Sequence, residues 1–259
     1  MLGLSPHIEL CYTREGMPRN ARKFKIEVGG FYHVVKRGVN RGHVFRNGQD
    51  YSRFILGLEL FNSVQPINLW SIVSRSGDSP STASTVGERV QRVRENKGKP
   101  IVEIHGFCLM PNHIHLILRE ITDGGISDFI KKLGGFSTYF NKRYNRTGPL
   151  FEGRFKAVPI QSDEQLANTF RYVHTNPVEL WEPKWKEFQV KNPGEAIKKL
   201  ESYRPSSYLD YIGKENSPPF ITKDFFLEFF GGEKDCQLAV EDWIKFKAHS
   251  AVVGVEQLE

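Results

Sequence analysis

The stretch CLMPNHIHLILRE, residues 108–120, decides how this sequence folds. Apolar residues on both sides of Pro111-Asn112 are typical of two β-strands joined by a tight turn, so we expect a hairpin over 101–120. In a strand, alternate side chains point to the same face, which places His113 and His115 roughly 6.6 Å apart on one face. Ile114 then points to the opposite face, into the core.

Two imidazoles on one face of a strand can converge on a divalent cation, if a third protein ligand and open positions for substrate are present. The same pattern also arises when two histidines merely form hydrogen bonds on the solvent side of a strand. The hairpin alone leaves both interpretations open.

The segments around the hairpin predict an α+β fold. Expected strands cover 31–39, 101–110, 113–120 and 154–161, and expected helices cover 47–64, 125–145 and 163–176. Ser162 precedes two acidic residues and suits a helix cap, and Pro177 should end that helix. This order is the ferredoxin-like split βαβ pattern, with helices on one face of an antiparallel sheet and one additional helix.

The chain divides into three stretches by composition, and the middle one carries an insertion. Residues 1–28 read as a loose arm, and 29–180 form the main domain. Residues 74–100 are rich in Ser, Thr and Gly and then charged, which indicates an inserted surface loop with a short helix from Val86. Residues 181–259 form an extension with Trp- and Pro-rich loops and expected helices at 223–230 and 234–248.

Composition narrows the class of protein. Of the 259 residues 39% are hydrophobic and 25% charged, and no stretch reaches the roughly 18 apolar residues of a membrane span. The first residues meet charge too early for a secretory signal. Three widely spaced cysteines without a CxxC pair indicate reduced thiols. We therefore expect a cytoplasmic protein that binds no membrane.

The positive charge is concentrated in one segment. The net charge is +6, and residues 131–156 contain seven Lys or Arg against one acid, Glu152, which also amounts to +6. Six aromatic residues are interleaved with these cations. Cations that contact phosphates and rings that stack on bases suit a nucleic-acid surface. An amphipathic helix with its rings in the core gives the same pattern, so this alternative stays open.

A second candidate motif is YVHTNPV, residues 172–178. Tyr172 and Asn176 are four residues apart and therefore share one helical face. A phenol and an amide held together could act as nucleophile and metal ligand, although a core tyrosine and a helix-end asparagine before Pro177 would look the same.

Taken together, these stretches resemble the REP-associated tyrosine transposases, a branch of the single-tyrosine HUH transposases. PNHIH (111–115) is similar to the histidine motif of that group and YVHTNPV to its tyrosine helix. Three further matches fall in the same order: FYHVVKRGVNRGHVF (31–45), FSTYFNKRYNRTGPLFEGRFKA (136–157) and YRPSSY (203–208). The sequence departs from the group at the long 74–100 insertion and at NPVELWEP, which lacks the usual glycine after Asn-Pro-Val.

The resemblance implies a mechanism for the main domain, an HUH nuclease palm. His113, His115 and Asn176 would hold Mg²⁺ or Mn²⁺, and Tyr172 would attack a phosphodiester of single-stranded or hairpin DNA to form a 5′-phosphotyrosine. Monomeric and dimeric arrangements both fit one tyrosine per chain. The matching positions that we expect to contact DNA are Arg37, Asn40, Arg41, Lys142, Arg143, Arg146 and Arg154.

Other assignments remain open. Tyr139 and Tyr144 are rival nucleophiles, but neither has a partner amide like that of Tyr172. His33, His105 and His174 are interpreted as structural or as supports for the metal ligands. The chain could also be a catalytically silent nucleic-acid-binding protein. A metal-dependent hydrolase or oxygenase would need a carboxylate beside the histidines, for which Glu103 and Glu120 are the nearest in sequence.

Overall fold

The computed structural model describes residues 24–68, 72 and 85–256, with side chains to 248. At its centre lies a four-stranded antiparallel sheet in the order β2-β3-β1-β4. This order is the one that a ferredoxin-like split βαβ chain produces, so the predicted α+β fold class is confirmed. The strands are β1 (Phe31–Arg37), β2 (Val102–Met110), β3 (His113–Glu120) and β4 (Lys156–Ile160).

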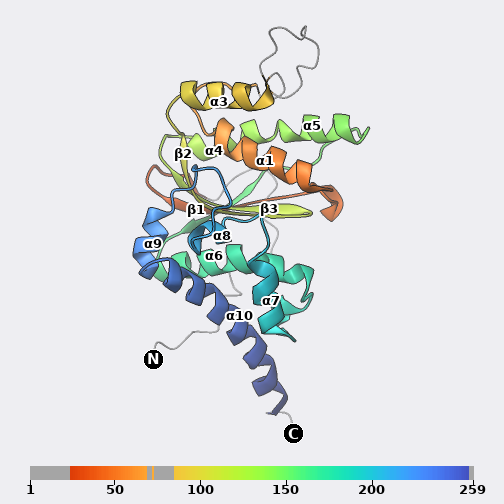
Figure 1. Cartoon of the computed structure of the whole chain (residues 1–259), viewed down its shortest axis with the longest axis vertical. Coiled ribbons are helices and arrows are strands. Elements are labelled where there is room, and N and C mark those ends of the chain that lie inside the picture. The colour runs from red at the N-terminus through yellow and green to blue at the C-terminus, as the bar shows by residue number, and fades with distance from the viewer. Residues whose placement is uncertain (1–23, 69–71, 73–84, 257–259) are drawn as a thin grey trace.

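Helices cover both faces of the sheet (Figure 1). One face carries α1 (Gly48–Phe61), α4 (Gly125–Leu133) and α5 (Phe136–Arg143), with α3 (Val86–Asn96) outside them. The additional helix, α6 (Asp163–Thr175), lies on the opposite face together with the C-terminal elements. These elements are the 3-10 turns η3 (Asn176–Leu180) and η4 (Trp185–Glu187) and the helices α7 (Pro193–Leu200), α8 (Tyr208–Tyr211), α9 (Asp224–Phe230) and α10 (Glu233–Glu256).

The alternation of side chains along β3 divides the interior into two cores. Ile114, Leu116 and Leu118 belong to the core beneath α1, α4 and α5, whereas Ile117 belongs to the core beneath α6. The second core also contains Trp185, Tyr208, Phe226 and Ile244, so residues 181–248 pack with α6 against this face of the sheet. His113 and His115 share the parity of Ile117 and therefore face α6.

Most predicted boundaries agree with the structure within a few residues. The Ser162 hydroxyl accepts a hydrogen bond from the Gln165 amide and begins α6, and the helix from Val86 is α3, with Thr85 as its cap. The expected arm falls largely on residues 1–23, and much of the expected insertion falls on residues 73–84. Both of these stretches lie outside the described residues.

The single helix predicted over 125–145 is wrong, because two glycines interrupt it. The amides of Gly134 and Gly135 donate to the carbonyls of Lys131 and Lys132, three residues back, and α5 begins afresh at Phe136. Glycine has low helix propensity, and these tighter bonds let the chain change direction between α4 and α5. Within the described residues, no helix is both long enough and apolar enough to cross a bilayer.

The edge of β2 is covered by the YRPSSY segment. The Leu109 amide donates to the Pro205 carbonyl at 2.8 Å, and the Ser207 amide donates to the Phe107 carbonyl at 3.0 Å. The Ser207 hydroxyl also accepts from the Phe107 amide at 2.8 Å and contacts Nε2 of His174 at 2.9 Å. Open strand edges attract other chains, so this segment protects the sheet and ties α6 to it.

Asn62 fastens the end of α1 to the start of β2 and provides a test of this arrangement. Its side chain is buried, donates to the Val102 carbonyl at 2.8 Å and accepts from the amides of Ile101 and Val102 at 3.0 and 3.1 Å. Asn62→Ala leaves these backbone groups without partners, so we expect a loss of about 2–3 kcal/mol in the free energy of unfolding, measured with urea. Asn96→Ala, on the exposed end of α3, should change it by less than about 0.5 kcal/mol; equal effects would contradict the role of Asn62.

Candidate active site

The two motifs singled out in the sequence meet on the α6 face of the sheet. The rings of His113 and His115 are 4.8 Å apart between centroids, and the Tyr172 ring is 5.5 Å from His115 in an edge-on arrangement. Nε2 of His113 lies 3.3 Å from Oδ1 of Asn176. All four side chains come from one chain, so a second copy is not needed to assemble them.

The packing of α6 places the tyrosine and the asparagine. Leu166, Phe170 and Val173 are buried on one side of the helix and seat it on the sheet. Tyr172 is half-buried, and Asn176, one turn further on, is buried where α6 passes into η3. η3 begins at Asn176 and has Pro177 as its second residue. The chain therefore changes from α to 3-10 geometry at Asn176, the residue that faces His113.

The hydrogen bonds leave a set of free lone pairs. Nδ1 of His113 lies 2.6 Å from Oδ1 of Asn112, an acceptor, so Nδ1 carries the ring proton. In a neutral imidazole Nε2 is then bare, and it faces a second acceptor, the Asn176 oxygen. Nε2 of His115 is buried and has no partner among the described residues. Two bare nitrogens on rings 4.8 Å apart, with an amide oxygen 3.3 Å from one of them, are ligand atoms of the types that a divalent cation takes.

Burial keeps the imidazoles neutral at physiological pH. Desolvation, with smaller contributions from Lys186 and Arg37, lowers the pKa of His113 to about 4. Desolvation and the neighbouring histidines hold the pKa of His115 well below its ordinary value. A histidine binds metal through an unprotonated nitrogen, so both rings are in the form that a cation requires. Within the described residues, no group of three His, Cys, Asp or Glu side chains could hold a metal ion. The side-chain oxygen next to Nε2 of His113 is that of the Asn176 amide.

His33 supports the second imidazole. It lies in β1, and its Nε2 is 2.8 Å from Nδ1 of His115, with the two rings stacked at 5.0 Å. If Nε2 of His115 faces a cation, its Nδ1 carries the proton and donates it to His33, which fixes the orientation of the ring. His105 and His174 instead contact Glu103 and Ser207, at 3.1 and 2.9 Å.

A hollow of about 390 Å³ opens beside His113 and is lined by charged residues. Arg37, which pairs with His113 across β1 and β3, lies in it together with Arg41. The loop between them is tightly built, because a Cβ on Gly38 would lie 2.2 Å from the Gly42 carbonyl oxygen. Asn40 and Arg41 are in the left-handed region, with φ of 54° and 57°. The side chains of Arg37, Asn40 and Arg41 are exposed. They lie in or next to this tight loop, beside the histidines.

Two residues of this hollow were not expected from the sequence. Glu179 in η3 and Lys186 in η4 line it and form an ion pair of 2.5 Å with each other. Charged residues are common in such loops, and only the missing glycine after Asn-Pro-Val marked this stretch as unusual.

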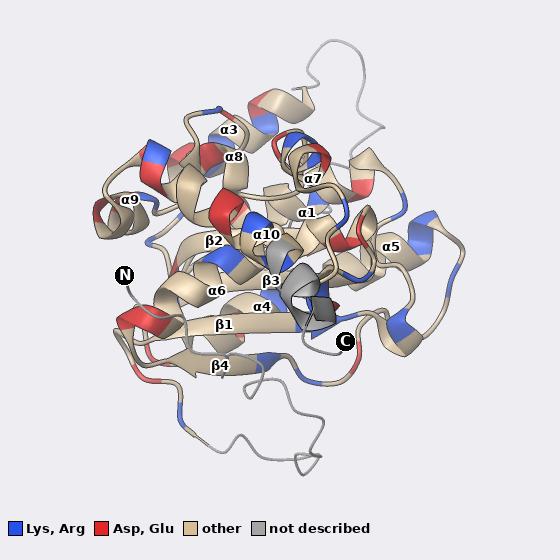
Figure 2. Ribbon diagram, turned by 90° about the horizontal axis from the view of Figure 1, so that it is seen from below, with Lys and Arg blue, Asp and Glu red and all other residues tan. Residues whose placement is uncertain are grey.

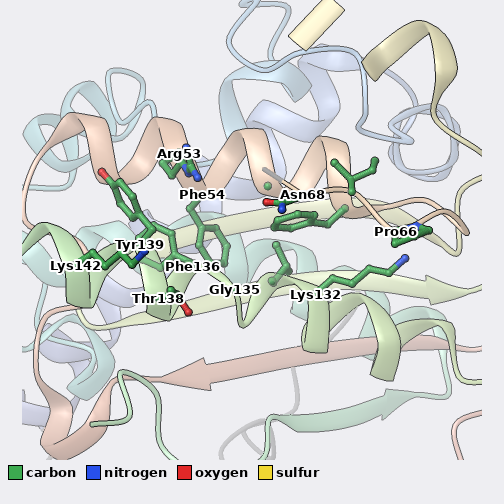
Figure 3. Close-up of a pocket in the computed structure, with 14 residues that line it drawn as sticks. Arg53, Phe54, Pro66, Asn68, Lys132, Gly135, Phe136, Thr138, Tyr139 and Lys142 are labelled. Carbon is green, nitrogen blue, oxygen red and sulfur yellow. The ribbon is translucent and has the colours of Figure 1, made fainter. Parts of the chain in front are cut away.

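The remaining predicted DNA contacts lie away from the histidines. Lys142 and Arg143 belong to α5, on the other side of the sheet, where Lys and Arg recur along α5 and the loop that follows it (Figure 2). Lys142 lines a separate aromatic cavity between α1 and α5 (Figure 3). Arg143 pairs with Asp50 at 3.7 Å, and Arg146 donates to Asn141 and to the Pro149 carbonyl. Arg154 is exposed before β4.

The rival tyrosines are structural in this arrangement. The hydroxyls of Tyr139 and Tyr144 donate to the buried carboxylate of Asp50 at 3.1 and 2.7 Å. Burial and the Asp50 charge raise the pKa of Tyr139. Phe136 and Phe140 of the same helix are buried in the core. Part of the aromatic pattern in the basic segment therefore reflects an amphipathic helix.

Comparison with known proteins agrees with the resemblance read from the motifs. Residues 80–176 match the family described as IS200-like transposases, a range that includes His113, His115, Tyr172 and Asn176. This match confirms the resemblance over those residues. No curated protein matches the chain. A solved structure of a REP-associated tyrosine transposase bound to a REP hairpin aligns with a TM-score of 0.46 at 14% identity, over 79% of this chain and 92% of the other.

The contact between His33 and His115 gives a testable expectation. His33→Phe keeps a buried ring but removes the partner of His115 Nδ1, so we expect the affinity for Mn²⁺ to fall about 10- to 100-fold. Titration calorimetry on the folded protein measures this directly. His105→Phe, equally buried but paired with Glu103, is the matched control, and a similar loss in both variants would contradict a specific role for His33.

Proposed function

We propose that this protein cleaves and rejoins single-stranded DNA, with Tyr172 as the nucleophile and a covalent 5′-phosphotyrosine as the intermediate. The observation that supports this most is the edge-on approach of the Tyr172 ring to His115, beside the bare nitrogen and oxygen of His113 and Asn176. A phenol beside a set of cation ligands is the arrangement that phosphoryl transfer to tyrosine requires.

The proposal assigns Mg²⁺ or Mn²⁺ to Nε2 of His113, Nε2 of His115 and Oδ1 of Asn176. When bound there, a divalent cation supplies Lewis-acid polarisation of a phosphate oxygen. Three protein ligands leave open positions for that oxygen, as a catalytic site needs. His33 and Asn112 orient the two imidazoles through their second nitrogens.

The chemical step exchanges one phosphoester bond for another, so the energy of the bond is retained. The phenolic oxygen of Tyr172 forms a bond to phosphorus as the bond from phosphorus to the 3′ oxygen breaks. The proton that the phenol gives up is balanced by the proton that the departing 3′ oxygen takes up. A 3′-OH that attacks the phosphotyrosine reverses the sequence and restores a DNA strand, so rejoining needs no external energy source.

The DNA partner is proposed from the motifs and the charges. Arg37 and Arg41 lie beside His113 and suit the phosphates that flank the scissile bond. Lys142 and Arg154 are exposed elsewhere on the molecule and suit more distant backbone contacts. Arg143 pairs with Asp50, and Arg146 donates to Asn141. Recognition of a hairpin is proposed from the resemblance to the REP-associated enzymes.

The alternatives have less support from the geometry. Glu103 pairs with His105 and Arg119, and Glu120 accepts the Ile126 amide at 2.7 Å, so neither carboxylate belongs to the histidine pair. A two-histidine hydrolase built on Glu103 or Glu120 is therefore not favoured. A silent binding protein would not need Nε2 of His115 and Nδ2 of Asn176 to stay buried without partners among the described residues, since each such atom costs about 1–3 kcal/mol.

Replacement of the nucleophile tests the proposal. We incubate the protein with 5′- or 3′-labelled hairpin oligonucleotides drawn from sequence flanking the gene, in Mn²⁺, and resolve covalent adducts by denaturing electrophoresis. Wild type and Tyr139→Phe should form an adduct, whereas Tyr172→Phe should form none, because its phenolic oxygen is missing.

Each other outcome points elsewhere. An adduct in Tyr172→Phe would assign the nucleophile to another residue. Cleavage without an adduct would indicate a hydrolase, and salt-sensitive binding without cleavage across the whole hairpin panel would indicate a silent binder.

A further inference from the structure

We propose that Lys186 is a phosphate-contacting residue of the Tyr172 site and that the C-terminal helix α10 holds it there. This inference rests on the proposed function and extends it to a part of the chain beyond the residues that match the transposase family. It assigns an active role to the C-terminal extension, whose purpose the sequence does not reveal.

Lys186 lies close to the ligand histidines. It lines the same hollow as His113, Arg37 and Arg41. About 41% of its side chain is exposed, so the ammonium group remains accessible to a ligand.

The charges of the hollow favour an anion. Among its lining residues, the guanidinium groups of Arg37 and Arg41 and the ammonium of Lys186 are opposed by one carboxylate, that of Glu179. Glu179 holds Lys186 at 2.5 Å. A DNA phosphodiester carries one negative charge and can replace this carboxylate as the partner of Lys186. Glu179 thus keeps the lysine in place until DNA arrives.

The backbone around Lys186 is anchored by α10. Trp185, the preceding residue, is fully buried. The ammonium group of Lys247 lies 4.7 Å from the Trp185 ring centroid, 4.2 Å from that of Phe188 and 5.4 Å from that of Trp243. Lys247 is itself buried, and a desolvated cation enclosed by aromatic rings is one of the stronger forms of this interaction.

The turn after Lys186 also carries backbone strain. Phe188 has φ of 58°, a left-handed conformation that is unusual for a bulky residue. Such residues persist where the surroundings determine them, and here the contacts of Phe188 with Lys247 and Phe246 do so. η4 is therefore held on both sides of Lys186, by Trp185 and by Phe188.

The salt dependence of DNA binding tests the phosphate contact. In a Tyr172→Phe background, which prevents adduct formation, fluorescence anisotropy gives the affinity for a labelled hairpin oligonucleotide with a single-stranded tail at several salt concentrations. Lys186→Met should lower the slope of log K against log salt by about 0.7, the value for one lost single-strand phosphate contact. Lys186→Arg should retain the slope, and Lys198→Met, an exposed lysine of α7, should leave it unchanged.

Adduct formation provides the second measurement. With an active Tyr172, Lys186→Met should slow single-turnover adduct formation about tenfold or more, because a cation beside the reacting phosphate is lost. Glu179→Gln should tighten DNA binding, since the competing carboxylate is removed. A slope and rate in Lys186→Met equal to wild type would overturn the inference while the wild-type adduct still supports the proposed function. Weaker DNA binding in Glu179→Gln would overturn the idea that Glu179 competes with DNA for Lys186.

Lys247 tests the anchoring by α10. Lys247→Ala removes the ammonium group from among the rings of Trp185, Phe188 and Trp243 but changes no residue that lines the hollow. It should therefore lower the salt slope as much as Lys186→Met does. The double variant should lose no more than Lys186→Met alone, because both changes remove one contact. Lys245→Ala, on the exposed side of α10 in ion pairs with Glu241 and Asp242, is the control. Circular dichroism verifies folding, and Lys247→Met retains the aliphatic stem if the alanine variant unfolds.

The anchoring would be overturned if the double variant lost more slope than Lys186→Met alone. It would also be overturned if both folded Lys247 variants kept the wild-type slope.

Discussion

The whole site depends on one constraint, the strict alternation of side chains along a strand that is buried on both faces. In β3 the even positions Ile114, Leu116 and Leu118 fill the core beneath α1 and α4. The odd positions, His113 and His115, are thereby directed at α6 and cannot turn to solvent. Burial then lowers the pKa of both rings, so they are neutral and can offer lone pairs. Packing that stabilises the fold therefore also prepares the two imidazoles that we propose as metal ligands.

Burial of these polar side chains costs free energy of folding, and the fold alone does not require them at these positions. Nε2 of His115 and Nδ2 of Asn176 are buried without partners among the described residues, and each such atom costs about 1–3 kcal/mol. Replacing His115 by an aliphatic residue would remove its share of the cost and suit the neighbouring core of Ile117 and Phe170. The hydrogen bonds that Nδ1 of His113 and Nδ1 of His115 donate to Asn112 and His33 satisfy only one nitrogen of each ring. The remaining deficit is what a cation or a substrate can satisfy.

The sequence predicted those parts that depend on local patterns. Period-two alternation located β2 and β3, the Ser162 cap located the start of α6, and the four-residue spacing of Tyr172 and Asn176 placed them one turn apart. Local patterns could not show the break at Gly134 and Gly135, because propensity alone does not decide whether a helix continues. Nor could they show that α5 lies across the sheet from the histidines, or that Lys186 comes near His113. Those contacts depend on which face of the sheet each element covers. A similar pattern of charged and apolar residues is compatible with either face.

The division of the cations between two sides of the sheet restricts how one DNA molecule can engage them. Arg37 and Arg41 open toward His113, whereas Lys142 and Arg143 lie beyond α1. The two regions meet at the end of the sheet, where His43 lines both the hollow of His113 and a neighbouring hollow with Arg46 and Arg146. Arg46 is itself fixed 4.4 Å from the Tyr144 ring centroid, which rests on Asp50. Under the proposed function, a DNA strand that contacts both Tyr172 and α5 would run along the loop at 37–46, because the two hollows share His43. Asp50, which holds Tyr139, Tyr144 and Arg143, would then position the far side of that path without contact with the reacting groups.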